Sequence, residues 1–349
     1  MSDALLEVND LKVHFTTGEG VVKAVDGVTY NIARGKTLCV VGESGSGKSV
    51  AARAILGIVH HPGKVAGGTI TYHKPAETGG REAIEITALK PNGAAIRSIR
   101  GGEIAMIFQE PMTSLSPMYT VGNQIVEAIR LHNDVSKAEA NNRAVELLRR
   151  VGIPKPETRI NEFPFRMSGG MLQRCMIAMA LSCNPKLLIA DEPTTALDVT
   201  TQAQILDLMR QLQADFGMAL LFITHDLGVV AEIADDVAVM YLGKVVESAN
   251  VDTIFNAPAH PYTRALLASI PTIGAVRTRL RPIEGIVPSA LNRPRGCVFH
   301  TRCAQRIKGL CDVVTPESFA VGDGQAARCL IYDAKYAAQF TAKVPVGTA

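Results

Sequence analysis

The feature that most constrains this chain is the glycine-rich stretch at residues 42–49, Gly-Glu-Ser-Gly-Ser-Gly-Lys-Ser. It fits the pattern G-x-x-x-x-G-K-[ST], in which the backbone of a loop cradles phosphate groups. An apolar, β-prone run precedes it at residues 37–41, and a segment of helical character follows at residues 50–56. Because the motif needs a strand before it and a helix after it, this context favours a phosphate-binding loop over an ordinary Gly/Ser turn.

Each residue type in this loop has a physical role. The glycines let the backbone curl so that N–H groups point inward at phosphate oxygens, and the helix N-terminus adds a partial positive charge. Lys48 would reach the β- and γ-phosphates, and the Ser49 hydroxyl would bind Mg²⁺. The expected nucleotide-binding residues of the loop are Gly42, Ser44, Gly45, Ser46, Gly47, Lys48 and Ser49.

A second apolar run, at residues 186–190, ends in the acids Asp191 and Glu192. At the carboxyl end of a strand, Asp191 can hold the Mg²⁺ shell, and Glu192 can point at a water that attacks the γ-phosphate. By itself this pattern would be read as a strand that ends in solvated acids, but after a phosphate loop it is not. A further predicted strand at residues 218–224 ends at His225, and we expect His225 at the same edge, near the γ-phosphate.

The remaining patterns predict an α/β fold. Residues 5–41 alternate in the manner of short antiparallel strands separated by turns. A buried strand over 103–109 ends at Gln109, and apolar positions at helical spacing between about 122 and 152 indicate a helical subdomain at about 110–170. Strands at about 236–241 and 244–247 would complete the core.

Length and composition limit the number of domains and the kinds of partner that this chain can have. The chain has 349 residues and is 47% apolar and 20% charged, which suits about two domains. A net charge of +3 gives no support to a nucleic-acid partner. No run approaches the apolar length of a membrane span, and the first residues lack the features of a signal peptide, so we expect the protein in the cytosol.

After residue 250, prolines and arginines interrupt the regular spacing of apolar residues that is typical of strands and helices. We therefore expect a nucleotide-binding domain at 1–250 and a loop-rich extension at 251–349. Four of the seven cysteines fall in the extension, and in a reducing compartment such a cluster argues for a metal rather than disulfides. Their spacing does not separate Zn²⁺ from an iron–sulfur cluster, and free buried thiols are a third possibility. The four are Cys297, Cys303, Cys311 and Cys329.

Several of these motifs, in one order, resemble an ABC-transporter ATPase subunit. They are the phosphate loop, Gln109, Ser168-Gly169-Gly170-Met171, Asp191-Glu192, Ala196-Leu197-Asp198 and His225. Three further stretches resemble the oligopeptide/dipeptide-importer ATPases, the last two of them in the C-terminal extension. These are Thr113-Ser114-Leu115-Ser116-Pro117, His260-Pro261-Tyr262-Thr263 and Gly296-Cys297-Val298-Phe299-His300-Thr301-Arg302-Cys303.

The resemblance implies roles that the residues alone do not. Phe15 would stack on adenine, and Gln109 would sense Mg²⁺ and contact a membrane subunit. The stretch from Ser168 through Gly169 to Gly170 would bind the γ-phosphate of ATP held by an opposite subunit, and Asp198 would cross the dimer interface. The family signature usually ends in Gln where this chain has Met171, a residue familiar in the importer subfamily.

The resemblance also implies a function and its partners. The chain would be the ATP-hydrolysing subunit that powers import of di- or oligopeptides, peripheral at the cytoplasmic face of the cell membrane, with a [4Fe–4S] cluster on the four cysteines. It would work with a second, paralogous ABC ATPase, two transmembrane permease subunits and an extracytoplasmic solute-binding protein. A sister importer for nickel, glutathione, opines or sugars is the alternative. A soluble ABC ATPase of translation or DNA repair is disfavoured, because such proteins usually carry two cassettes or a long coiled-coil insertion.

Overall fold

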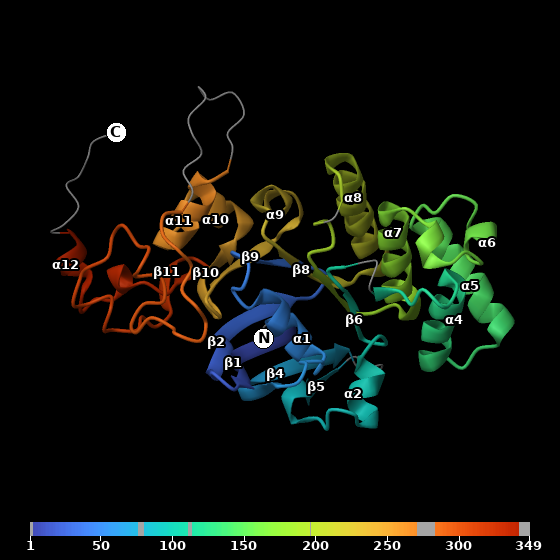
Figure 1. Ribbon diagram of the computed structural model, residues 1–349, viewed down its shortest axis with the longest axis horizontal. Helices are drawn as coiled ribbons and strands as arrows, with labels where there is room; N and C mark the ends of the chain where they lie inside the picture. Colours follow the sequence, from blue (N-terminus) through green and yellow to red (C-terminus); the bar gives the residue numbers. More distant parts are fainter. Residues whose placement is uncertain (1–2, 76–79, 111–113, 196, 271–282, 342–349) are drawn as a thin grey trace.

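The computed structural model describes residues 3–75, 80–110, 114–195, 197–270 and 283–341. Two sheets form its centre, with a helical arm at one end of the molecule and the C-terminal segments at the other (Figure 1). This arrangement confirms the predicted α/β fold with an antiparallel layer and a helical subdomain.

The first sheet is antiparallel and has the strand order β2-β1-β4-β5. The strands are β1 (Ala4–Thr17), β2 (Gly20–Ala33), β4 (Gly63–Pro75) and β5 (Arg81–Glu85), and η1 (Ile86–Ala88) and α2 (Ala94–Ile99) follow them. Its inner face carries the apolar side chains that cover α1 (Lys48–Ile55).

The short strands predicted ahead of the glycine loop merge into two long strands, β1 and β2. The expected interruptions are irregular positions within them, where Asp10 has a φ of 47° and Gly27 a φ of 89°. The register between β1 and β2 shifts between Val8 and Leu11. A bulge takes up an extra residue without ending the strand, so the chain continues in the same direction through these positions.

The second sheet has eight strands in the order β11-β12-β10-β9-β3-β8-β7-β6. Its central strands run parallel, and their carboxyl ends meet at one edge, where open α/β sheets place their ligands. Every residue of β3, β7 and β8 is buried, as expected for strands covered on both faces. These strands are β3 (Thr37–Val41), β6 (Ile104–Ile107), β7 (Leu187–Asp191), β8 (Ala219–Thr224) and β9 (Asp236–Tyr241), and β10 (Lys244–Asn250) is antiparallel to β9.

The helical arm follows β6. The periodic segment between about 122 and 152 contains two helices, and Ser136 caps the N-terminus of the second. The arm contains α4 (Val121–His132), α5 (Lys137–Arg150), α6 (Pro156–Arg159), η2 (Pro164–Arg166), α7 (Gly169–Ala180) and η3 (Leu181–Cys183). Beside it lie α8 (Val199–Phe216) and, nearer the sheet centre, α9 (Leu227–Ile233) (Figure 1).

The C-terminal segments pack against the eight-stranded sheet and add two strands to it. Antiparallel pairing joins β12 to β10, with Glu247 opposite Ala327. A small apolar cluster of Leu310, Cys311, Leu330 and Phe340 lies within the extension itself. The elements are α10 (Val251–Asn256), α11 (Pro261–Ala268), β11 (Phe319–Gly322), β12 (Gln325–Ala327), η4 (Leu330–Tyr332) and α12 (Ala337–Thr341). None of the described helices is long and apolar enough to cross a lipid bilayer.

Candidate nucleotide-binding site

The glycine loop runs from the end of β3 to the start of α1, as the sequence predicts. Two of its glycines are required by close approach and backbone angle. A Cβ on Gly42 would lie 2.1 Å from the Met240 carbonyl oxygen, and a Cβ on Gly47 would lie 2.3 Å from that of Ala24. Both have a φ that L-residues rarely adopt, 153° and 98°. Gly47 is also the N-cap of α1 and offers no side chain to that helix end.

Lys48 is buried within the loop, and its ammonium group binds loop carbonyls. Its Nζ donates to the carbonyl oxygens of Gly42 at 2.7 Å and Glu43 at 3.1 Å. Burial lowers the pKa of the Lys48 side chain from its usual range, while the nearby Glu192 and Asp191 carboxylates oppose this shift. The amine is therefore held where a phosphate could take over its hydrogen bonds.

Ser49 and Asp191 meet at the end of β7 although they are far apart in sequence. The Ser49 hydroxyl donates to Asp191 Oδ1 at 2.7 Å. The other carboxylate oxygen, Oδ2, is buried without a hydrogen-bond partner, and burial raises the pKa of Asp191. A buried carboxylate oxygen without a partner beside a hydroxyl is an oxygen-donor set of the kind that Mg²⁺ uses, so these residues fit the expected ion.

Glu192 follows β7 in a left-handed conformation, with a φ of 47°. Its carboxylate accepts hydrogen bonds from the Gln109 amide and the Thr195 hydroxyl, both at 3.0 Å. His225 Nδ1 lies 3.5 Å from the other carboxylate oxygen, and 56% of the His225 side chain is exposed. The chain thus brings Gln109, Glu192 and His225 together at the carboxyl edge of the sheet.

The signature stretch is separate from this cluster. Ser168 caps α7 by accepting a hydrogen bond from the Met171 N–H at 3.3 Å, and Ser168 and Gly169 are exposed. A Cβ on Gly170 would lie 3.0 Å from Thr201 of α8. Within the described parts of the chain, no hydrogen bond or ion pair joins this stretch to the glycine loop.

Asp198 caps α8 and lies near the signature stretch rather than near Lys48. It accepts hydrogen bonds from the Thr201 N–H at 3.0 Å and the Thr201 hydroxyl at 2.7 Å. These bonds lower the pKa of Asp198. The preceding Ala196 of the predicted motif lies outside the described residues, whereas Asp198 itself is exposed.

Phe15 lies near the end of β1, opposite Val22 of β2 and Gly63 of β4. It is half-buried and packs at the margin of the core that surrounds α1. A Cβ on Gly63 would lie 2.5 Å from the Phe15 ring, so the ring occupies the space that this glycine leaves open. Its proposed contact with adenine stays a prediction.

Three residues that contact the glycine loop were not assigned a role from the sequence. Glu43 lies inside the loop, and Tyr262 and Arg302 belong to the C-terminal extension. The Glu43 N–H donates to the Tyr262 hydroxyl at 3.0 Å, and Arg302 donates to both carboxylate oxygens of Glu43 at 2.6 and 3.0 Å. No local sequence signal points to these contacts, because Arg302 and Glu43 are 259 positions apart.

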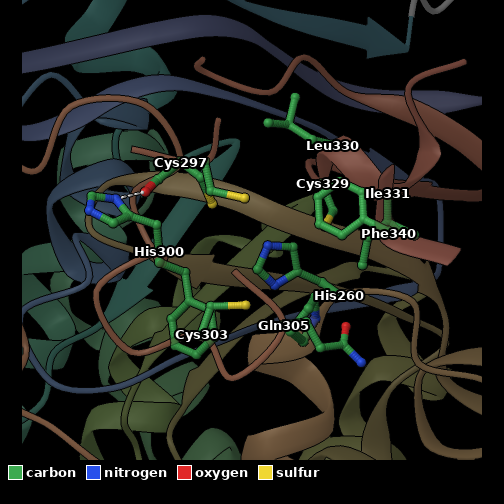
Figure 2. Close-up of a pocket in the computed structure, with 12 residues that line it drawn as sticks. His260, Cys297, His300, Cys303, Gln305, Cys329, Leu330, Ile331 and Phe340 are labelled. Atoms are coloured by element: carbon green, nitrogen blue, oxygen red, sulfur yellow. Dashed lines mark hydrogen bonds between the residues drawn. The ribbon is translucent and has the colours of Figure 1, made fainter. Parts of the chain in front are cut away.

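The four cysteines of the extension line one cavity, together with His260, His300 and Phe299. Figure 2 shows the side chains of Cys297, Cys303 and Cys329 around it. Burial raises the pKa of Cys297 to about 12 and that of Cys329 to about 11. Among the residues that the structure describes, no three Cys, His, Asp or Glu side chains form a metal-ion site. The metal-binding extension expected from the sequence is therefore not shown.

The fold and this site define a P-loop nucleotide-hydrolysing protein, in which a glycine loop, a magnesium-side carboxylate and a neighbouring glutamate share one sheet edge. Residues 25–195 match the family model for the ABC transporter. Residues 246–311 match the model for the oligopeptide/dipeptide transporter, C-terminal region.

Two relatives are similar over nearly their whole lengths. The chain is 49% identical to the oligopeptide transport ATP-binding protein AppD of Bacillus subtilis (strain 168), over 96% of this chain and 99% of that protein. It is 46% identical to the dipeptide transport ATP-binding protein DppD of Escherichia coli (strain K12), over 93% and 96%. The chain belongs to the family of ABC transporter ATP-binding proteins, and it is an ATPase coupled to transport.

Solved structures agree with this placement. A dimeric bacterial ABC transporter cassette, MJ0796, superposes with a TM-score of 0.61 at 26% identity, covering 70% of this chain and 98% of that one. The same cassette in a dimeric post-hydrolysis state, bound to ADP and phosphate, gives a TM-score of 0.60.

Proposed function

We propose that this chain hydrolyses ATP to drive import of di- or oligopeptides across the cytoplasmic membrane. The observation that carries this proposal is the joint presence of an ABC transporter match and a C-terminal region of the oligopeptide/dipeptide type. The relatives named above are ATP-binding proteins of oligopeptide and dipeptide transport. We further propose that residues 1–250 form the nucleotide-binding domain and 251–349 the extension.

Different residues of the site would bind the phosphates, hold Mg²⁺ and accept the proton during hydrolysis. Lys48 and the N–H groups of the glycine loop would bind the β- and γ-phosphates, while Ser49 and Asp191, with Gln109, would hold Mg²⁺. That ion would neutralise charge on the phosphate oxygens. Glu192 would accept a proton from the attacking water, and His225 would hold the γ-phosphate.

The exposed signature supports a two-subunit mechanism. Ser168 caps α7, which begins at Gly169, and a helix N-terminus attracts anions, yet no phosphate site in the part of the chain that the structure describes lies beside it. We propose that it binds the γ-phosphate of ATP on a second cassette, with Asp198 at the same interface. Phosphate release would then break the contact between subunits and switch the assembly.

The partners follow from this mechanism. The second cassette would be a paralogue, and two permease subunits would bind near Gln109 at the cytoplasmic face of the membrane. A solute-binding protein outside that membrane would deliver the peptide. A sister importer for nickel, glutathione, opines or sugars would use the same ATPase, but the relatives named here favour peptides.

Co-purification tests the assembly. A tagged full-length chain, expressed with the rest of its system, should retain two polytopic membrane proteins and a second cassette in detergent. Proteoliposomes of that complex with its solute-binding protein should take up a labelled dipeptide when ATP is inside. Uptake of Ni²⁺ or glutathione in place of peptides would overturn the substrate class, and purification without any membrane protein would overturn the transport role.

We also propose a [4Fe–4S] cluster on the four cysteines of the extension, with Zn²⁺ as the alternative. The fit rests on the donor set, since four thiols line one cavity and thiolates bind either group. A single tetrahedral zinc needs all four sulfurs within about 2.3 Å of one point. The described residues hold no such arrangement. The resemblance to the oligopeptide/dipeptide-importer ATPases is the reason to prefer the iron–sulfur cluster.

The substitution Cys303→Ser should remove iron from the protein, because a serine hydroxyl is a far poorer ligand for iron–sulfur clusters than a thiolate. Iron and acid-labile sulfide would be measured on full-length protein purified without oxygen. Cys183→Ser, a cysteine of the helical arm, is the matched control and should keep the wild-type iron content. Equal iron in both variants, or zinc in place of iron in the unaltered protein, would contradict the cluster.

A further inference from the structure

Glu43 is the point at which the C-terminal extension and the nucleotide site touch. Its N–H and its carboxylate are bound by Tyr262 and Arg302, as described above. Its carbonyl oxygen accepts hydrogen bonds from Lys48 Nζ at 3.1 Å and from the Ser46 N–H at 3.2 Å. All three polar groups of one loop residue are therefore occupied, two by the extension and one by the phosphate-binding lysine.

The contact from Arg302 is rigid. Only 4% of its side chain is exposed, against 27% for Glu43. Its guanidinium also donates to the backbone carbonyls of Ile283 and Glu284 and to the Tyr241 hydroxyl, and it lies 5.9 Å from the centre of the Tyr241 ring. A two-point contact between a guanidinium and a carboxylate fixes orientation as well as distance, and shielding from water strengthens it.

The contact from Tyr262 is equally fixed. Tyr262 is fully buried at the start of α11, and its ring packs against Tyr241 at 4.7 Å and Phe299 at 5.3 Å between centroids. The Tyr262 N–H donates to His260 Nδ1 at 3.0 Å. The hydroxyl that accepts from Glu43 is thus carried by a packed aromatic cluster rather than by a mobile surface side chain.

We propose that Arg302 and Tyr262 are positioning residues for ATP binding, which act on the phosphate-binding lysine Lys48 through Glu43. A loop with glycine at three positions has little conformational preference of its own, so its bound shape must be held from outside. Arg302 and Tyr262 of the extension fix the shape of the loop through their bonds to Glu43. This role concerns the ATP site alone and does not depend on which solute is transported or on what the cysteines bind.

The competing explanation is that these bonds only attach the extension to the core. A double-mutant cycle separates the two, with Arg302→Ala, Glu43→Gln and the double variant made in the full chain. Equilibrium binding of a fluorescent ATP analogue would be measured on the subunit, and KM and kcat for ATP on the assembled transporter. We expect each single variant to weaken ATP binding about tenfold through KM, since bonds to charged groups are strong. The double variant should be no worse than either single one.

The conservative variant Arg302→Lys should recover part of the lost affinity, because it keeps the charge but not the two-point geometry. Arg295→Ala, at an exposed arginine of the same extension, should bind ATP as the unaltered protein does. Normal ATP affinity in Arg302→Ala, or independent and additive effects of Arg302→Ala and Glu43→Gln, would overturn the proposal. If Arg302→Ala does not fold, Glu43→Gln and the tyrosine pair described next decide the question.

Tyrosine variants provide a matched pair. Tyr262→Phe removes the hydroxyl that accepts from Glu43, and Tyr332→Phe removes one that donates to the Ala259 carbonyl at 2.9 Å, away from the loop. Each variant removes one tyrosine hydrogen bond of the extension, the first between the extension and the glycine loop and the second within the extension itself. We expect Tyr262→Phe to weaken ATP binding about three- to tenfold and Tyr332→Phe to leave it unchanged. Equal affinities in the two variants would show that the bonds only attach the extension.

Discussion

Glu192→Gln should abolish ATP turnover while leaving ATP binding intact. Glutamine keeps the shape of the side chain and its contacts with Gln109 and Thr195, but it cannot accept the proton of the attacking water. General-base catalysis contributes about 10²–10⁴-fold, so we expect kcat to fall by at least about 100-fold with KM for ATP little changed. Steady-state phosphate release by the assembled transporter and filter binding of labelled ATP measure the two quantities.

Glu139→Gln provides the control for this substitution. Glu139 is an exposed glutamate of α5 that pairs with Arg143, so the same atom change there should alter neither binding nor turnover. Turnover within a few-fold of normal in Glu192→Gln would remove Glu192 from the role of base. Loss of ATP binding in the same variant would instead show that the carboxylate is needed to hold the nucleotide.

Of the substitutions proposed here, Glu247→Ala should lower the free energy of unfolding the most. Glu247 is buried in β10, and its carboxylate accepts hydrogen bonds from the Ala259 N–H at 2.7 Å, the His260 N–H at 2.8 Å and the Gln325 amide at 2.9 Å. Alanine leaves these donors buried without acceptors, which costs about 1–3 kcal/mol each. We expect a loss of about 3 kcal/mol or more, seen as a fall in Tm of roughly 5–10 °C.

The matched control is Glu232→Ala, because Glu232 is a surface glutamate paired with Arg210. Exposed ion pairs contribute about 0–1 kcal/mol, so its Tm should hardly change. Thermal unfolding of the full chain, followed by far-UV circular dichroism, compares the two. A Tm for Glu247→Ala equal to that of the control would mean that the buried carboxylate does not anchor residues 257–261 and β12 to the core sheet.

Local patterns predicted the nucleotide loop and the strands around it well. The strand expected at residues 37–41 is β3, and the helix expected after the loop is α1. The acids expected at the end of an apolar strand are Asp191 and Glu192, with Asp191 as the last residue of β7. These features depend on residues that are neighbours in the chain, so a short window of sequence contains the information that determines them.

Predictions of strand ends and of the extension failed because these features depend on pairing with segments that are distant in the sequence. Short strands were expected in residues 5–41, but the partner strands continue past the irregular positions Asp10 and Gly27 and make them bulges within two long strands. The extension was expected to be rich in loops, yet β12 pairs with β10 and Phe299 packs into the main core. A strand without a local partner cannot be placed until the sheet that receives it is known.

The amino-acid sequence by itself determined the chemistry of this protein: a phosphate loop with its lysine, a magnesium-side carboxylate and a candidate base, each in the order of a transport ATPase. Only the tertiary structure decided that Arg302 and Tyr262 hold Glu43, and that Glu247 anchors the extension. Loop conformation follows from the backbone preferences of adjacent residues. Contacts between distant residues exist only once the whole chain has packed, because burial and geometry select which donors and acceptors meet.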